Sequence, residues 1–223
     1  MRDADNLHEV DLGGEQTVLV LARNAYLIRE QIEPALVAQG IVYERNGRSS
    51  LNMKALSAAE SWTRLGRGQA ITVSDARVMY EYLKEKTGRK RGFKELKQFG
   101  DEVDRLVTTQ DLVDHGGLMM DPSAIWSTAL ERLPAEDVAY MTAARRRGER
   151  LRAAPRVRVS TIHSAKGGEA DHVVLFREMA KRTHREMEEK PEDEARVWYV
   201  AVTRAKNDIT LIAPETAQSC PWI

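Results

Sequence analysis

Polar residues whose types and spacing could do chemistry are concentrated in two blocks, Thr161–Leu175 (TIHSAKGGEADHVVL) and Glu194–Ile212 (EARVWYVAVTRAKNDITLI). The first block places Lys166 and Glu169 in a polar, glycine-containing turn, and the second provides Arg204. A loop that follows a buried strand is where open α/β sheets bind their ligands. The pattern therefore predicts a ligand-binding loop that bears a lysine and a carboxylate, together with an arginine from a second element.

Other kinds of site fit the same residues less well. Four residues could suggest a metal, namely His163, Glu169, Asp171 and His172. Their spacing matches no HExxH or Cys/His site, so we predict no metal ligand. Ser164 with Lys166 resembles a serine–lysine pair only loosely, because the lysine follows by two residues rather than three. The chain also contains no GxxxxGK(S/T) or GxGxxG pattern, so it lacks the usual self-sufficient nucleotide-binding loop.

The elements that must position these residues have the pattern of an α/β fold. Val157–Ser160 and Val173–Phe176 are apolar runs on either side of the polar loop and predict two strands. Ala195–Val202 has helical spacing, and Asp208–Ile212 alternates like a strand. Upstream, Thr17–Ala22 (TVLVLA) is typical of a strand buried on both faces of a parallel sheet.

A helix and another strand are expected directly after Thr17–Ala22. Residues 25–39 have apolar side chains at helical spacing, Gly40 is a plausible C-cap, and Ile41–Tyr43 begins a strand. Pro34 falls inside this helix and would cost about 3 kcal/mol unless it lies at a kink. Strand, helix and strand in such a short stretch predict a βαβ unit.

The domain organisation follows from where strand patterns give way to helical ones. Residues 16–45 and 155–214 are expected to form one α/β domain, interrupted by a helical insertion over residues 46–154. Residues 1–15 are polar and are expected to be a linker, and residues 215–223 a C-terminal tail. Within the insertion and the second block, Trp62, Trp126, Trp198 and Tyr199 are predicted to be core residues.

Composition excludes several classes of protein. The 223 residues include 34 Lys plus Arg and 34 Asp plus Glu, so the net charge indicates no strong bias toward nucleic acid or membranes. Locally, Arg145–Arg158 has seven arginines and one glutamate. A single cysteine, Cys220, fits a reducing compartment, and no apolar run is long enough for a membrane helix. A cytoplasmic protein without a membrane partner is expected.

The two polar blocks resemble motifs of a known family. The first resembles motif V (T-x-H-x-x-K-G-x-E) of the UvrD/Rep-like superfamily 1 DNA helicases, and the second resembles their motif VI (R-x-x-Y-V-x-x-T-R-A). Val18–Tyr43 resembles motif IV more weakly, with Ala22 where that motif usually has a tyrosine. The resemblance implies a second, C-terminal RecA-like domain: an α/β, P-loop-type parallel sheet with helices on both faces.

The resemblance also implies a cofactor and partners. ATP with Mg²⁺ would bind between this domain and an N-terminal RecA-like domain, which would supply the phosphate loop and hold Mg²⁺. This chain has neither of those motifs, so the isolated chain is expected not to hydrolyse ATP. Single-stranded DNA would be the other partner. The alternative is a non-enzymatic nucleic-acid-binding or docking module with a helicase-like fold.

Individual roles follow from the matched positions. Arg204 matches the arginine finger of motif VI, and Arg23 matches a motif IV arginine that also approaches the γ-phosphate. Residues expected to bind the nucleotide are Glu169, through the ribose hydroxyl, and Gly168, Gly167 and Lys166 of the same loop. Residues expected to face DNA are Thr161, His163 and the basic run Arg145, Arg146 and Arg147, which leads toward the same loop.

Overall fold

The chain forms two compact units, which are described separately below. The computed structural model describes residues 1–165 and 168–223. Unit 1 comprises residues 1–50 and 142–223, and unit 2 comprises residues 51–141. These limits differ from the predicted insertion over residues 46–154, because α7 (Ala135–Arg147) runs across the second boundary and its last residues belong to unit 1.

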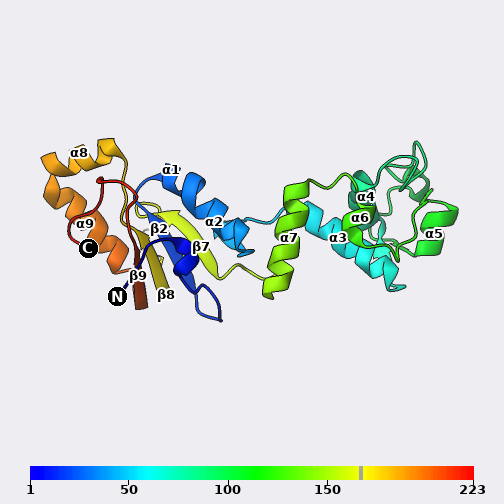
Figure 1. Ribbon diagram of the computed structural model, residues 1–223. Helices are drawn as coiled ribbons and strands as arrows, with labels where there is room; N and C mark the ends of the chain where they lie inside the picture. The colour runs from blue at the N-terminus through cyan, green and yellow to red at the C-terminus, as the bar shows by residue number, and fades with distance from the viewer. Residues whose placement is uncertain (166–167) are drawn as a thin grey trace. The chain divides into compact units, whose positions relative to one another are not determined.

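Unit 1 is built on a seven-stranded sheet in the order β1-β9-β8-β2-β7-β3-β4 (Figure 1). Its strands are β1 (Arg2–Ala4), β2 (Val18–Ala22), β3 (Tyr43–Arg45), β4 (Arg48–Ser49), β7 (Val157–Thr161), β8 (Ala170–Phe176) and β9 (Ala205–Ile212). All neighbouring strands are parallel except β3 and β4. This mostly parallel sheet, with helices on its faces, confirms the predicted RecA-like α/β fold.

Alternate residues of β2 enter two cores on opposite faces of the sheet. Val18, Val20 and Ala22 pack with α1 (Ala25–Leu27), the π-helical turn η2 (Ile28–Ile32) and α2 (Glu33–Ala38). Leu19 and Leu21 pack with the helices on the other face, α8 (Lys181–Glu189) and α9 (Pro191–Val202). The period of two along a strand explains this division, and burial on both faces explains the continuous apolar run.

The helix predicted over residues 25–39 is present, but it changes its geometry in the middle. The π-helical turn η2 precedes α2, and Pro34 lies in the first turn of α2. The backbone stays helical from η2 into α2, and the Glu33 N–H donates to the Ile28 carbonyl in the π-helical pattern. Pro34 therefore lies directly after an irregularity of the helix, which is where a proline is tolerated.

Both ends of the chain are more ordered than the sequence indicates. The expected linker over residues 1–15 is wrong, because β1 pairs with β9 and Leu7, Val10 and Leu12 are buried. The expected tail is also part of the fold, since Cys220 is buried and its backbone N–H donates to the carbonyl of Arg177 at 3.0 Å. Widely spaced apolar residues in these polar segments are sufficient to anchor them.

Unit 2 is mainly helical around its own core. Its elements are α3 (Met53–Gly66), β5 (Ile71–Thr72), α4 (Val73–Tyr82), η3 (Lys97–Phe99), β6 (Leu106–Val107), α5 (Thr109–Asp114), α6 (Trp126–Ala129) and the first half of α7. Trp62 is fully buried as predicted and donates from Nε1 to the carbonyl of Ala124 at 2.8 Å, whereas Trp126 is only half-buried. Among the described residues, no helix has the length and apolarity needed to cross a bilayer.

The ordered N-terminal segment gives a stability prediction. Leu12→Ala should lower the free energy of unfolding by about 2–5 kcal/mol, because it removes a fully buried side chain. The matched control Leu106→Ala removes a side chain that is 63% exposed and should change it by less than about 0.5 kcal/mol. Urea unfolding of the two variants measures both values, and equal small effects would mean that residues 1–15 are a linker after all.

Candidate functional site

Arg23 and His163 meet where the parallel strands end. The carboxyl ends of these strands are here called the carboxyl edge of the sheet, and their amino ends the amino edge. Ala22 and Thr161, the last residues of β2 and β7, are paired in the parallel ladder. Arg23 therefore leaves β2 next to the turn that follows β7. Its Nη1 lies 3.4 Å from Nδ1 of His163, whose side chain is otherwise exposed. The structure thus brings together one residue expected at the nucleotide and one expected at DNA.

Arg23 is held by an acidic residue that the sequence interpretation missed. Its Nε and Nη2 donate to the two carboxylate oxygens of Glu194 at 2.6 and 2.9 Å. Only 16% of the Arg23 side chain and 8% of the Glu194 side chain are exposed. Glu194 also accepts a hydrogen bond from Nε1 of the buried Trp198 at 3.0 Å. A paired and largely buried arginine of this kind is fixed in position and neutralised.

The position of Glu194 in the sequence carried a signal for this role. Glu194, Trp198 and Ala201 share helical spacing, and all three are buried on the inner face of α9. A single carboxylate in an apolar helical face needs a buried partner. The same phase places Tyr199 on the outer face, where it is 70% exposed, so its predicted place in the core is wrong. Trp198 is in the core as predicted.

A second missed residue, Asn24, fixes the chain that follows β8. Its Oδ1 accepts from the backbone N–H of Ala180 at 2.8 Å, and its Nδ2 donates to Oγ1 of Thr183 at 2.9 Å. These bonds tie the start of α8 to the end of β2. Asn24 therefore helps to build the carboxyl edge without needing a ligand of its own.

The hydroxyl of Thr161 holds the turn after β7. Its Oγ1 accepts from the backbone N–H of Ser164 at 3.2 Å and forms a hydrogen bond with the Ser164 hydroxyl at 3.0 Å. This local pattern closes the turn and competes with an extended continuation of the strand. Thr161 thus shapes the turn that presents His163.

Glu169 and Arg204 lie together at the opposite, amino edge of the sheet. They directly precede β8 and β9, and the Ala170 N–H donates to the Arg204 carbonyl at 3.0 Å. The Glu169 side chain is exposed, while its carbonyl accepts from Nη2 of Arg158 at 2.6 Å. Among the described residues, neither the Glu169 carboxylate nor the Arg204 guanidinium has an ion-pair partner.

Arg204 lies against the last turn of its own helix. Its Nε donates to the Val200 carbonyl at 3.0 Å, and its Nη2 lies 3.4 Å from Oγ1 of Thr203. Basic side chains often bind the free carbonyls at a helix C-terminus in this way. The side chain is half-buried, and these contacts leave its charge uncompensated by any carboxylate of the described chain.

The two arginines expected at one γ-phosphate therefore do not converge. A residue that follows a parallel strand and a residue that precedes one lie at opposite edges of the sheet. The length of β8 from Ala170 to Phe176 separates those edges by about 20 Å. Arg23, moreover, already binds a carboxylate. The structure does not support a direct γ-phosphate contact for Arg23.

The glycine loop is described only in part. Lys166 and Gly167, both expected at the nucleotide, lie outside the described residues. The N–H of Gly168 donates to the Ala165 carbonyl at 2.9 Å. A Cβ at Gly168 would lie 3.4 Å from that oxygen, so the described part of the chain tolerates a side chain there. The described residues therefore do not themselves require glycine at position 168.

The basic run expected at DNA is also separated from His163. Arg145, Arg146 and Arg147 are exposed at the end of α7, which precedes β7, whereas the turn that bears His163 follows β7. Nε of Arg147 lies 4.0 Å from Oε1 of Glu149, and Nη2 of Arg156 lies 3.6 Å from the same oxygen. The run and the turn therefore do not form the single tract that the sequence suggested.

Two of the residues considered for a metal, His172 and Asp171, have structural partners. Nε2 of His172 lies 2.9 Å from the Thr210 hydroxyl, and burial lowers the pKa of His172. Asp171 accepts from the hydroxyl and the N–H of Thr17 at 2.7 and 2.9 Å, and these bonds lower its pKa. The described parts of the chain contain no group of three metal-ligating side chains.

The buried pair predicts strong coupling between Arg23 and Glu194. Either Arg23→Ala or Glu194→Ala should reduce the free energy of unfolding by about 3 kcal/mol, because each leaves the partner charge buried and unpaired. The double variant should lose less than the sum of the two. Urea unfolding of the four proteins gives the coupling energy, with the exposed Glu192→Ala as a control. Simple additivity would show that the pair does not form.

Comparison with known proteins places these residues in a family. The model of the UvrD-like helicase C-terminal domain matches residues 63–216, which is more than half of the chain. The match contains Thr161, His163, Glu169 and Arg204 but not Arg23. A search of curated proteins gave no match. Helicase domains of this family bind DNA and nucleotide together with an N-terminal domain. The chain belongs to the family of UvrD-like helicase C-terminal domains.

Proposed function

We propose that this chain is the second motor domain of an ATP-dependent DNA helicase and that Arg204 is its arginine finger. Support comes from the Arg204 guanidinium at the end of α9, which has no ion-pair partner among the described residues, and from the exposed Glu169, whose neighbour Ala170 donates to the Arg204 carbonyl. The nucleotide phosphates and Mg²⁺ would be held by an N-terminal RecA-like domain. This pair at the amino edge is the observation that carries the proposal.

The residues at the amino edge suit the parts of a nucleotide, because Arg204 is a cation and Glu169 is a hydrogen-bond acceptor. ATP supplies the γ-phosphoryl group that is transferred to water. Arg204 neutralises the charge that spreads over the phosphoryl oxygens, an effect worth roughly 10³–10⁵ in rate in nucleotide hydrolases. Glu169 accepts a hydrogen bond from a ribose hydroxyl, and Gly168 permits close approach of the backbone. Gly167 and Lys166 are proposed to complete this loop.

The carboxyl edge is proposed to bind single-stranded DNA through His163. Arg23 is always a hydrogen-bond donor, so Nδ1 of His163 must be the acceptor in their contact. The proton of the neutral imidazole then lies on Nε2, where it can donate to a phosphate oxygen. We therefore reassign Arg23 from the γ-phosphate to the orientation of His163. Thr161 closes the turn on which His163 lies.

The arginine-finger assignment predicts a large loss of catalysis. In a helicase that joins this chain to its N-terminal domain, Arg204→Ala should lower kcat about 10³-fold or more while ATP binding stays measurable. The control Arg185→Ala removes an exposed arginine from α8, outside both motifs, and should leave kcat near that of the unchanged protein. A kcat that survives Arg204→Ala would remove the assignment.

The isolated chain should not hydrolyse ATP, because its sequence has no phosphate-loop pattern. DNA-stimulated ATP hydrolysis by residues 1–223, abolished by Arg204→Ala, would contradict this expectation. The alternative, a non-enzymatic nucleic-acid-binding or docking module, predicts that the chain joined to an N-terminal domain also stays inactive.

The role of His163 can be tested on the chain alone. His163→Ala should weaken binding of labelled single-stranded DNA by about tenfold, as expected for the loss of roughly 1–3 kcal/mol per stacked or hydrogen-bonded contact. His8→Ala, which removes an exposed histidine from the N-terminal segment, is the control. Fluorescence anisotropy measures both affinities, and equal affinities would exclude His163 from the DNA contact.

A further inference from the structure

Arg23 is a cation at the carboxyl edge, yet its charge is cancelled within unit 1. The guanidinium group of an arginine stays protonated in proteins. Its Nε and Nη2 donate to the two carboxylate oxygens of Glu194 at 2.6 and 2.9 Å. Both side chains are largely buried, so dissolved salt screens their attraction only slightly. The pair therefore presents almost no net charge to an approaching anion.

One side of the same guanidinium group is not occupied by Glu194. A guanidinium has five N–H donors, and Glu194 accepts only from Nε and Nη2. The remaining nitrogen, Nη1, lies 3.4 Å from Nδ1 of His163, whose side chain is exposed. Arg23 thus has donors on the side where the DNA strand is proposed to bind, but it lacks a free positive charge there.

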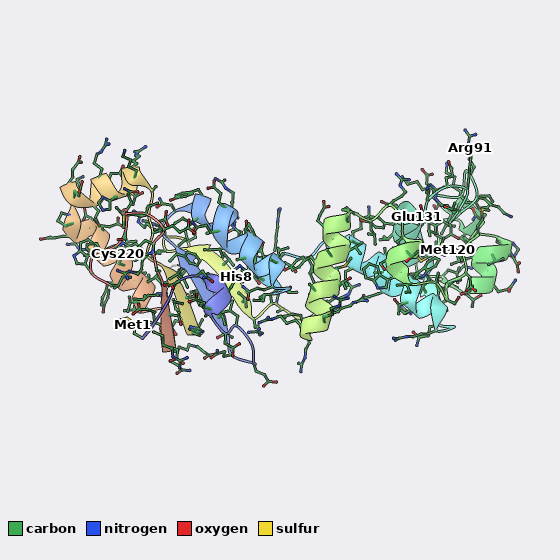
Figure 2. The ribbon with its side chains drawn as sticks, viewed as in Figure 1. Met1, His8, Arg91, Met120, Glu131 and Cys220 are labelled. Carbon is green, nitrogen blue, oxygen red and sulfur yellow. The ribbon has the colours of Figure 1, made fainter. Side chains whose placement is uncertain are left out.

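Glu194 is held in place independently of Arg23. Its Oε1 also accepts from Nε1 of Trp198 at 3.0 Å. Trp198 packs in the core on this face of the sheet together with Cys220, which Figure 2 labels beside α9. The carboxylate therefore stays in position whether or not Arg23 binds it. A DNA phosphate would have to draw Arg23 away from a fixed carboxylate.

Stability alone does not account for this ion pair. Two charges that are removed from water lose hydration that their mutual attraction barely restores. Apolar residues of similar size at such positions are often equally stable or more stable. The meeting of a cation and a carboxylate at this edge is better explained by control of a charged ligand.

We propose that Glu194 neutralises Arg23 and thereby keeps the binding of single-stranded DNA at the carboxyl edge weak. This role rests on the proposed function, because it takes the binding of DNA at that edge as given. A strand that meets a neutral pair releases fewer counterions than one that meets a free cation, so it gains less affinity. A helicase must release each phosphate that it binds in order to move, and a neutralised arginine favours that release.

Removal of the carboxylate should strengthen DNA binding by the full 223-residue chain. Glu194→Gln keeps the size of the side chain and an acceptor for Trp198, but it leaves Arg23 positively charged. One additional charged contact should tighten binding of labelled single-stranded DNA about tenfold at low salt. It should also steepen the slope of log Kobs against log salt by about 0.7. Fluorescence anisotropy between about 50 and 200 mM salt measures both quantities.

Two further variants test whether Arg23 causes the gain. Glu192→Gln removes the same charge from an exposed position in the first turn of the same helix, and it should leave affinity and slope nearly unchanged. The double variant Arg23→Gln with Glu194→Gln also lacks the cation, so the gain should disappear. A gain that persists in the double variant, or that Glu192→Gln reproduces, would overturn the proposal.

A milder substitution covers the loss of stability expected when Arg23 is left unpaired. Glu194→Asp keeps the negative charge but shortens the side chain, which weakens the bidentate contact without leaving a buried charge alone. It should tighten DNA binding by less than Glu194→Gln does. Urea unfolding shows which variants are folded, and Glu194→Asp decides the question if Glu194→Gln is not. Unchanged affinity in the folded variants would contradict the proposal.

The same titrations separate this proposal from the proposed function. Binding that depends on His163 but does not respond to Glu194→Gln would overturn the role of Glu194 and leave the strand contact intact. Binding that responds to Glu194→Gln but not to His163→Ala would remove the His163 contact and support neutralisation of Arg23. No binding by either the unchanged chain or Glu194→Gln at about 50 mM salt would contradict both.

Discussion

The parallel pairing of β2 with β7 and β8, and of β8 with β9, decides at which edge of the unit 1 sheet Arg23, His163, Glu169 and Arg204 lie. Residues that follow these strands gather at one edge, and residues that precede β8 and β9 gather at the other. The first edge has Arg23 and His163, and the second has Glu169 and Arg204. His163 after β7 and Glu169 before β8 lie only six positions apart in the sequence, so a single motif contributes a residue to each proposed ligand.

Helix α9 is the second physical link between the edges. Glu194, near its start, is bonded to Arg23, and Arg204 follows its end. Nine residues of helix and cap lie between Glu194 and Arg204, and the ten helical steps from one to the other correspond to about 15 Å. Helix α9 therefore has a buried, bidentate ion pair near its start and an unpaired arginine after its end. This arrangement couples the position of the proposed arginine finger, Arg204, to the proposed DNA-binding edge. Removing Glu194 should loosen that tie, because no other carboxylate of the described residues pairs with Arg23.

Much of this arrangement was predictable from the sequence. The continuous apolar run of β2 indicated a strand buried on both faces, and the two polar blocks indicated the family. Three points were not predictable from local patterns. The edge on which a residue lies depends on strand direction, so Arg23 and Arg204 could not be separated before the topology was known. The order of residues 1–15 depends on the distant partner β9. Tyr199 was misplaced because its neighbour Trp198, not Tyr199, sets the buried phase of α9.

Photocrosslinking of bromodeoxyuridine-substituted single-stranded DNA to the chain, followed by tryptic mapping, tests the assignment of the two edges most directly. The peptide over residues 159–166 contains His163, and the peptide over residues 197–204 contains Trp198, Tyr199 and Arg204. Aromatic side chains favour crosslinking, so the chemistry itself is biased toward the second peptide. The separation of the edges predicts that the crosslink maps to residues 159–166. A crosslink located at Thr203 or Arg204, after the end of α9, would place DNA at the amino edge and contradict it.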